Sequence, residues 1–422
     1  MTTPAERYAA ARRRQAVESS ALTSFERLYP FGLDPFQLRA CEALEAGDGV
    51  LVAAPTGAGK TVVGEFAVHL ALAEGRKCFY TTPIKALSNQ KYADLVRRHG
   101  AHSVGLLTGD NTVNGEAPVV VMTTEVLRNM LYAGSPTLRG LGYVVMDEVH
   151  FLSDRFRGAV WEEVIIHLPE SVRLVSLSAT VSNAEEFGDW LVTVRGNTVV
   201  IVEEHRPVPL WQHVMANNRL YDLFVGDADH AKVNPELVRL AREQDKLARN
   251  GDRRPQRGAR RPRRVWSPSR AEVIQRLDAD GLLPAITFIF SRAGCDAAVE
   301  QCLRSGLRLL QPHERDEVRA LVDEQCADIP EEDLAVLGYS AWRDGLERGV
   351  AAHHAGMLPT FKEVVEQLFV RGLVKAVFAT ETLALGINMP ARSVVLERLV
   401  KWNGETHADV TPGEYTQLTG RA

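Results

Sequence analysis

Cysteine is scarce in this sequence, and its few residues lie far apart. The 422 residues include five cysteines, none of them in a C-x-x-C pair: Cys41, Cys78, Cys295, Cys302 and Cys326. An odd number of widely spaced thiols argues against both a disulfide framework and a zinc site. The pattern therefore predicts a protein of a reducing compartment, the cytoplasm.

Long apolar runs and a surplus of one charge are also missing. The N-terminal segment MTTPAERYAAARRRQAVESS contains arginines but no following apolar run, which argues against a secretory signal. No segment approaches the roughly 18 uninterrupted apolar residues of a membrane helix, so we expect a soluble protein without membrane contact. Because the net charge is −5, any contact with nucleic acid is expected to come from local patches.

The sequence does contain a series of short, valine-rich apolar runs. Each run stops at a polar or glycine-bearing turn, and amphipathic stretches separate the runs. Runs that are apolar on both faces indicate strands of a parallel sheet covered by helices. The expected strands are 49–55, 77–83, 118–124, 141–148, 173–180 and 198–204, then 285–290, 349–355, 375–380 and 393–400. The chain is therefore predicted to be an α/β protein with two doubly wound domains in tandem.

Breaks in this pattern predict the domain boundaries. We expect a flexible N-terminal arm over 1–23, a first domain over 24–204, a linker over 205–281 and a second domain over 282–422. Within the linker, residues 253–264 contain seven arginines interrupted by prolines and should be disordered. This arginine-rich tract either spaces the domains or captures nucleic-acid phosphates, and both interpretations stay open.

Residues 54–61 (APTGAGKT) lie directly after an expected buried strand and before an expected helix. They fit a phosphate-binding loop except at the first position, where Ala54 replaces glycine. Glycines let the backbone turn its N–H groups around phosphates, at the positive end of the following helix. Lys60 would reach the β and γ phosphates, and the Thr61 hydroxyl would bind Mg²⁺. The expected nucleotide-binding residues of the loop are Pro55, Thr56, Gly57, Ala58, Gly59, Lys60 and Thr61.

Asp147 and Glu148 follow another buried strand, in the segment MDEVH (146–150). Strand ends of an open α/β sheet form the edge where ligands bind. Asp147 is expected to hold Mg²⁺, and Glu148 is expected to orient or deprotonate the attacking water. An acidic pair alone is typical of a solvated strand end; its position after a phosphate loop favours the catalytic interpretation.

With the phosphate loop, the Asp-Glu-Val-His segment resembles the DExH-box helicases of superfamily two. The wider text DEVHFLSDR (147–155), with Gly158 and WEEV (161–164), is similar to their superkiller-like branch, which includes the RNA helicases that feed exosomes, and looks like its actinobacterial members. The resemblance runs from about Pro30 to the last residue. It implies two RecA-like domains that bind ATP with Mg²⁺.

The resemblance also assigns residues to the nucleotide and to coupling. Phe31 and Gln37 would recognise adenine, since a glutamine amide offers both a donor and an acceptor. Gly386 and Asn388 would reach the nucleotide from the second domain. Ser178, Thr180, His150 and Gln417 would couple hydrolysis to domain movement, although the Ser178–Thr180 segment is equally compatible with a helix N-cap.

The nucleic-acid track implied by the resemblance consists of short motifs at strand ends in both domains. Hydroxyls, amides and helix N-termini suit sugar–phosphate contacts that do not depend on base sequence. The expected residues are Pro83, Lys85, Asn89, Gly109, Asp110, Thr124 and Glu125 in the first domain, and Ser291, Arg292, His354, Thr380 and Glu381 in the second. His353 and His354 also raise a metal interpretation, but adjacent strand residues point to opposite faces and would not share an ion.

The segment QLTGR (417–421) resembles the start of the arginine-finger motif, which gives Arg421 a catalytic role. The chain stops at Ala422, so we expect a C-terminally truncated fragment with an incomplete second domain and weak ATP hydrolysis. The expected function is that of an ATP-dependent RNA helicase or translocase. The alternatives are a DNA repair helicase of a neighbouring branch and a truncated nucleic-acid-binding remnant. Expected partners are single-stranded RNA, with DNA as the alternative, and the RNA-degradation machinery, with the chain itself a monomer.

Overall fold

The computed structural model describes most of the chain: residues 20–109, 111–153, 157–179, 184–206, 208–216, 218–226, 231–250, 267–383, 389, 391–402 and 406–422. The arginine-rich tract and all but four residues of the predicted N-terminal arm lie outside these ranges. The chain divides into two compact units. The first contains residues 20–206 together with Pro412–Gly420, and the second contains the rest of the described residues.

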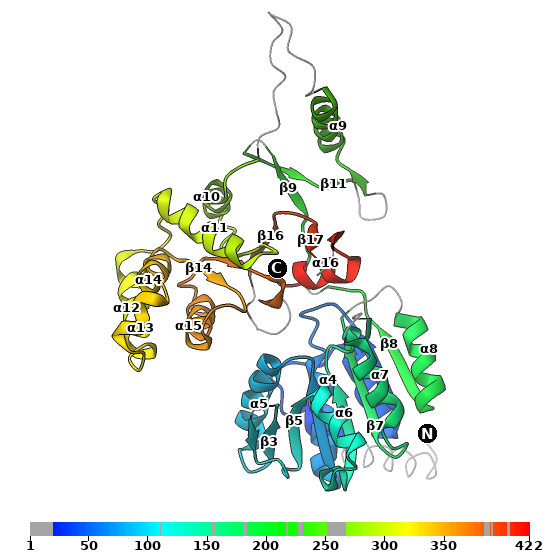
Figure 1. The fold of residues 1–422 in the computed structure, drawn as a ribbon. Helices are drawn as coiled ribbons and strands as arrows, with labels where there is room; N and C mark the ends of the chain where they lie inside the picture. Colours follow the sequence, from blue (N-terminus) through cyan, green and yellow to red (C-terminus); the bar gives the residue numbers. More distant parts are fainter. Residues whose placement is uncertain are drawn as a thin grey trace, which may run out of the picture. The chain divides into compact units, whose positions relative to one another are not determined.

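The first unit is built on one eight-stranded sheet (Figure 1). The strand order is β4-β3-β5-β2-β6-β7-β1-β8, and every pair is parallel except β3 with β4. The strands are β1 (Gly49–Ala53), β2 (Lys77–Thr82), β3 (Val104–Leu107), β4 (Thr112–Val113), β5 (Val119–Thr123), β6 (Leu141–Met146), β7 (Arg173–Ser178) and β8 (Thr198–Val202). The six strands predicted in this region are confirmed, and β3 and β4 were not predicted.

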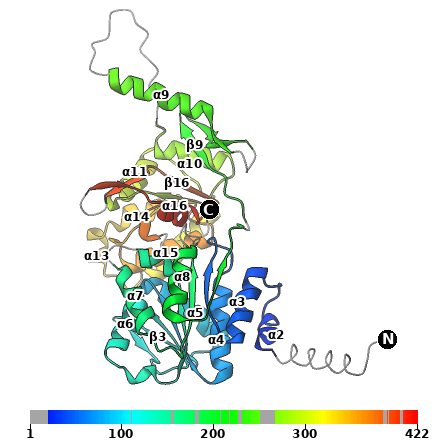
Figure 2. The same ribbon diagram turned by 90° about the vertical axis from the view of Figure 1, so that its right-hand side faces the viewer.

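Helices cover both faces of this sheet because its strands are apolar on both sides. Val50 and Val52 pack into one core cluster and Leu51, between them, into another. In Figure 2, α3 and α4 lie on one side of the sheet and α6 and α7 on the other. The helices are α2 (Ala21–Glu26), α3 (Pro35–Ala46), α4 (Thr61–Glu74), α5 (Lys85–His99), α6 (Thr124–Tyr132), α7 (Gly158–His167) and α8 (Ala184–Arg195). This is the doubly wound arrangement that the sequence predicted.

The second unit contains a four-stranded parallel sheet with the order β14-β15-β13-β16. Its strands are β13 (Ala285–Phe288), β14 (Val350–His353), β15 (Ala376–Ala379) and β16 (Ser393–Leu396). Its helices are α10 (Arg270–Ala279), α11 (Arg292–Arg304), α12 (Pro312–Gln325), α13 (Glu331–Val336), α14 (Tyr339–Glu347) and α15 (Pro359–Val370). The four predicted strands are confirmed, and with them the prediction of two RecA-like α/β units in tandem.

The predicted linker, 205–281, contains regular structure. It holds two antiparallel pairs, β9 (His213–Ala216) with β10 (Arg219–Asp222) and β11 (Phe224–Val225) with β12 (Lys232–Val233), followed by α9 (Pro235–Asn250). Ile274 and Leu277 of α10 are buried in the same core as Ala285 of β13. The packed part of the second unit therefore begins before Leu282, because an amphipathic helix next to the arginine-rich tract buries its apolar face against the sheet.

The C-terminal part adds a hairpin of β17 (Val400–Trp402) and β18 (His407–Asp409), then α16 (Pro412–Thr419). All five cysteines are free and buried. No helix within the described ranges combines the length and the apolar character needed to cross a bilayer.

Candidate active site

Most of the predicted site residues of the first unit lie at one edge of its sheet. The strands end in register: Ala53 of β1 pairs with Ser178 of β7, and Thr82 of β2 pairs with Thr123 of β5. Met146 of β6 pairs with Thr81 of β2. Because these strands are parallel, the segments that follow them all leave at the carboxyl edge. The phosphate loop and the acidic pair are therefore brought to the same edge.

The loop at 54–61 connects β1 to α4, as predicted. Gly57 has φ +84° and Gly59 has φ +83°, a region that side chains other than glycine rarely adopt. Ala54 N donates to Ser178 O at 3.1 Å, which anchors the start of the loop to β7. Thr61 is the first residue of α4, so the N-terminus of that helix faces the loop. This is the backbone geometry that suits a bound phosphate.

The Lys60 ammonium lies inside the loop. Its Nζ donates to Ala54 O at 2.7 Å and to Pro55 O at 2.9 Å. Burial lowers the pKa of Lys60, and the charges of Glu148 and Asp147 oppose this shift. The charges of the acidic pair therefore favour the charged form of Lys60, as expected for groups at the same edge of the sheet.

Gln37 contacts the phosphate loop directly. Its Nε2 donates to Gly59 O at 3.0 Å and to Ala58 O at 3.4 Å, and its Oε1 accepts from Asp34 N at 2.9 Å. The side chain is therefore engaged with protein groups at the start of α3. Phe31 is 57% exposed, and its ring centroid lies 5.3 Å from that of Tyr29. The exposed ring is available for stacking, and adenine recognition by these two residues stays a prediction.

Asp147 follows β6 and is held by three hydrogen bonds. Its Oδ2 accepts from Tyr80 Oη at 3.0 Å, its Oδ1 accepts from Glu148 N at 3.0 Å, and its own N donates to Thr81 O at 3.0 Å. Burial and the adjacent charge of Glu148 raise the pKa of Asp147, while Lys91, the Tyr80 hydrogen bond and Lys60 act in the opposite direction.

Glu148 has φ +53°, which is unusual for a residue with a long side chain. Its Oε2 lies 3.4 Å from His150 Nδ1, and Ala179 N donates to the same nitrogen at 3.4 Å. Burial lowers the pKa of His150. A positive φ at a residue other than glycine is a strained conformation, which often marks a functional position.

Of the predicted coupling residues, Gln417 contacts His150. Ser178 is buried at the end of β7, where its Oγ donates to Ala179 O at 2.8 Å. Gln417 of α16, which belongs to the first unit, has its Nε2 at 3.4 Å from His150 Nε2. Thr180 lies outside the described residues.

The donor set fits the predicted ligands. Thr61 and Asp147 offer oxygen atoms, which are the ligands that Mg²⁺ prefers, and the ion is usually bound by one or two protein groups plus phosphates. Apart from its chain neighbours, none of the described residues has an atom within 4 Å of the position that a methyl group on Gly57 would take, so the loop is open there. The loop, Lys60 and the acidic pair can therefore hold a metal-bound nucleoside triphosphate.

Arg157 connects two predicted nucleic-acid motifs of the first unit. Its guanidinium donates to Pro83 O and forms an ion pair with Glu125 of α6. Thr124, the first residue of α6, donates through Oγ1 to Thr82 O at 3.4 Å. Lys85 and Asn89 are exposed on the first turns of α5, and Gly109 is exposed after β3. Asp110 lies outside the described residues.

In the second unit, β13, β14 and β15 also end in register, at Phe288, His353 and Ala379. The predicted residues follow these ends. Ser291 Oγ accepts from Gly294 N at 3.2 Å as the N-cap of α11, and Arg292 is exposed beside it. His354 Nε2 contacts Asp296 Oδ1 at 3.0 Å, Thr380 Oγ1 contacts Thr382 Oγ1 at 2.9 Å, and Glu381 pairs with Lys401 at 2.6 Å.

The residues that the second domain was predicted to contribute to the nucleotide are only partly described. Gly386 and Asn388 lie outside the described residues. Arg421 belongs to the second unit, where its O accepts from Ala391 N at 2.9 Å. His353 contacts Glu366 of α15 at 2.8 Å, whereas His354 contacts α11, so the two imidazoles have carboxylate partners on different helices.

Sequence reasoning missed Tyr80 and Arg157. Each contacts a motif residue far away in the sequence, Asp147 and Pro83 respectively, and neither is part of a motif whose spacing predicts a role. The only signal was position: Tyr80 lies in the strand before TPIK, and Arg157 follows the DEVH segment by a few residues.

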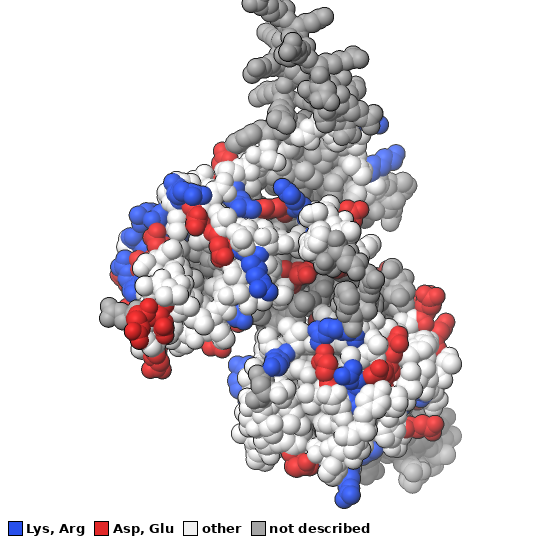
Figure 3. Space-filling view, in the orientation of Figure 1, with Lys and Arg blue, Asp and Glu red and all other residues white. Residues whose placement is uncertain are grey.

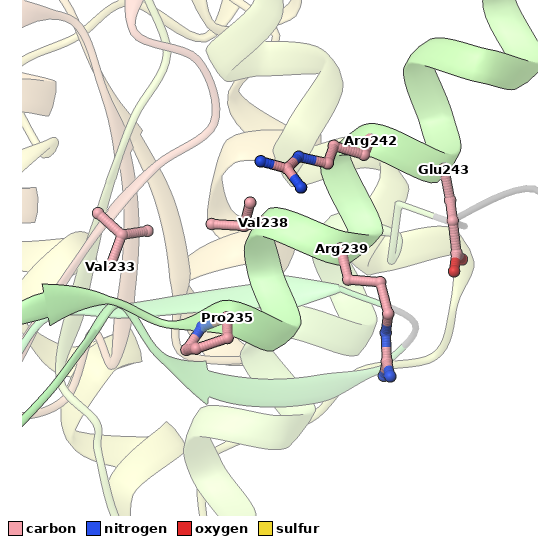
Figure 4. A pocket seen from close by; sticks show the side chains of 6 residues that line it. All are labelled: Val233, Pro235, Val238, Arg239, Arg242 and Glu243. Carbon is pink, nitrogen blue, oxygen red and sulfur yellow. The ribbon is translucent and has the colours of Figure 1, made fainter.

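One surface hollow lies away from the predicted site residues. A hollow at the start of α9 is lined by Val233, Pro235, Val238, Arg239, Arg242 and Glu243 (Figure 4), none of which is a predicted site residue. On the face drawn in Figure 3, lysine and arginine side chains are interspersed with aspartate and glutamate.

Comparisons with known proteins relate this site to helicases. Residues 34–187 match the family model described as DEAD/DEAH box helicase. The chain is 67% identical over 412 residues to a Mycobacterium tuberculosis protein called "Probable helicase HelY", covering 96% of this chain and 45% of that protein. It is 40% identical over 419 residues to human Superkiller complex protein 2, covering 96% of this chain and 33% of that protein. It is 38% identical over 405 residues to the ATP-dependent RNA helicase mtr4 of Schizosaccharomyces pombe, covering 94% of this chain and 36% of that protein. The chain spans less than half the length of these relatives.

Proposed function

This chain is a homologue of the mycobacterial helicase HelY and is related to the DExH-box helicases of the superkiller and mtr4 kind. On this basis we propose that it is an ATP-dependent helicase or translocase that moves along or unwinds RNA. One observation carries the proposal. The phosphate loop with Lys60 and the acidic pair of Asp147 and Glu148, from segments about 90 residues apart in the sequence, follow strands β1 and β6 and leave the same carboxyl edge of one parallel sheet.

The chemistry follows from these groups. The amides of the phosphate loop and Lys60 bind the triphosphate, and Thr61 and Asp147 hold Mg²⁺, which supplies charge neutralisation when bound. Glu148 orients the attacking water, and Arg421 contributes a positive charge to the transition state. In this proposal the first domain binds ATP, and the roles of Arg421, Gly386 and Asn388 at the nucleotide are those that the resemblance implies.

The nucleic-acid track is proposed to follow the strand ends of both units, where exposed Lys85, Asn89 and Arg292 suit backbone contacts. RNA is favoured because one relative is named an RNA helicase, whereas the name of HelY specifies no nucleic acid. We also propose that the protein is a monomer in the cytoplasm; the free cysteines are typical of a reducing compartment. A relative named as part of the superkiller complex motivates a partnership with an RNA-degradation complex.

The test is ATP hydrolysis with matched single-stranded RNA and DNA. We expect RNA to stimulate hydrolysis more than DNA of the same sequence and length. Glu148→Gln should abolish the stimulated turnover, which controls for contaminating ATPases. Equal stimulation by both nucleic acids would move the proposal to a DNA or dual-specificity helicase, and no stimulation by either would contradict a nucleic-acid motor.

A further inference from the structure

Tyr80 is a fully buried tyrosine next to the acidic pair. It lies in β2, is 0% exposed, and donates through Oη to Asp147 Oδ2 at 3.0 Å. A buried hydroxyl needs a hydrogen-bond partner, and a bond to a charged acceptor is stronger than one to a neutral acceptor. The contact therefore fixes the two side chains relative to each other across neighbouring strands.

The Asp147 carboxylate is oriented from both sides. While Tyr80 donates to Oδ2, the backbone of Glu148 donates to Oδ1 at 3.0 Å. A carboxylate has about four lone-pair positions, so these two donors leave others for a ligand. Groups held in place before the ligand arrives bind it without further ordering cost. Tyr80 thus stabilises one orientation of the carboxylate that is proposed to receive Mg²⁺.

Lys91 extends this contact to α5. Its Nζ lies 5.2 Å from the ring centroid of Tyr80, within the range of a cation–π interaction. The charge of Lys91 also acts on Asp147. The same helix carries Lys85 and Asn89, exposed on its first turns and proposed to contact nucleic acid. Helix α5 therefore connects the proposed nucleic-acid contacts to Tyr80, which in turn contacts the proposed metal ligand Asp147.

The neighbouring strand offers a matched tyrosine. Tyr143 of β6 is also 0% exposed and donates to a carboxylate, Glu74 Oε1, at 2.8 Å. Glu74 is the last residue of α4, whereas the phosphate loop precedes its first residue. Tyr143 therefore makes the same kind of hydrogen bond at the opposite edge of the sheet, away from the acidic pair.

We propose that Tyr80 is a positioning residue for the metal-bound nucleotide: its hydroxyl holds Asp147 in the orientation that receives Mg²⁺, and Lys91 connects this contact to α5. The inference rests on the proposed function, because it assumes that ATP and Mg²⁺ occupy the phosphate loop. Tyr80 acts through Asp147, so its removal should weaken the contribution of the metal and leave the metal-independent contacts of the nucleotide intact.

The experiment measures the affinity of a fluorescent ADP analogue for the chain, once with excess Mg²⁺ and once with EDTA. The ratio of the two affinities isolates the metal-dependent contribution and needs no hydrolysis. We expect Tyr80→Phe to reduce this ratio about tenfold, the usual value of a hydrogen bond to a charged group. The affinity in EDTA should stay at the wild-type value, which also reports that the variant is folded. Tyr143→Phe should leave both affinities unchanged.

If the ratio of the affinities with Mg²⁺ and with EDTA is the same in Tyr80→Phe as in the wild type, the inference is overturned. If Tyr80→Phe also loses binding in EDTA, Tyr80 supports the nucleotide site as a whole and the inference is overturned. Lys91→Gln tests only the connection to α5, because it leaves the hydrogen bond between Tyr80 and Asp147 in place; an unchanged ratio in that variant removes Lys91 from the inference. Failure of the proposed function has a different signature, since a wild-type chain without metal-dependent nucleotide binding would contradict the function itself.

Discussion

The side-chain amide of Gln37 closes against the backbone of Gly59 in the phosphate loop. Gln37 Nε2 donates to Gly59 O at 3.0 Å, and a methyl group on Gly59 would lie 2.6 Å from the same nitrogen. A contact this short requires one of the two groups to move. Gln37 therefore supports the loop from the start of α3, in addition to the adenine contact that the resemblance implies.

Gly59→Ala should destabilise the first unit more than Gly57→Ala. Both glycines have φ near +84°, so each alanine is expected to cost about 1–2 kcal/mol through backbone strain. Only position 59 adds a clash with Gln37, because nothing lies within 4 Å of a methyl group at position 57. Urea unfolding of the two variants measures the difference. Equal losses would show that Gln37 moves aside freely.

Glu148→Gly should stabilise the nucleotide-free chain while removing hydrolysis. Glycine adopts the φ of +53° found at Glu148 without the side-chain penalty, and the substitution also removes a carboxylate that raises the pKa of Asp147. We expect a gain of about 1 kcal/mol in the free energy of unfolding. Glu148→Ala is the control, since it removes the charge but keeps the backbone strain. If Glu148→Gly and Glu148→Ala have the same free energy of unfolding, backbone strain at this position does not affect stability.

Arg157→Lys should weaken RNA binding without changing nucleotide affinity. A lysine cannot reproduce the fork that contacts both Pro83 O and Glu125, so these two motifs lose their common partner. We expect about a tenfold loss in affinity for a single-stranded RNA. Arg128→Lys is the matched control, because Arg128 pairs with Glu163 at 3.7 Å on the surface, where ion pairs contribute little. Similar losses in both variants would indicate a general effect of charge.

The first unit should lose stability as the pH falls below about 6.5. Burial lowers the pKa of His69 and of His99, and Arg98 adds to the effect at His99. In the window between these lowered values and the unfolded value, the unfolded chain binds more protons, so stability rises with pH and is fully present above the window. His69→Gln should flatten the dependence, as measured by hydrogen exchange of β1 and β2 at several pH values. An unchanged slope would show that His69 does not contribute.

The strands of both sheets could be predicted because burial on both faces leaves a direct trace in the sequence. The valine-rich runs at β1, β5 and β6 have no polar face, and only a covered parallel sheet accommodates them. Strand β3 was missed because its four residues include Gly105, which weakens a strand pattern. Helix α10 was missed because it follows directly on the arginine-rich tract and was included in the linker.

The placement of candidate residues at one sheet edge was predictable where a motif lies within one loop, as at Lys60 or Asp147. The partners of these residues were not predictable, because they depend on which strands become neighbours. Tyr80 and Asp147 meet only because β2 lies beside β6. The left-handed backbone of Glu148 was also beyond sequence reasoning, since Glu is not a residue type that favours it.

The most direct test of the account is the affinity of the chain for ATP with Mg²⁺, compared between the wild type, Lys60→Ala and Glu148→Gln. Glu148→Gln is expected to bind ATP about as tightly as the wild type, because Glu148 acts on water. Lys60→Ala is expected to bind at least about tenfold more weakly, because a charged donor to the phosphates is lost. Equal affinities for Lys60→Ala and the wild type would contradict the assignment of this edge as an ATP site.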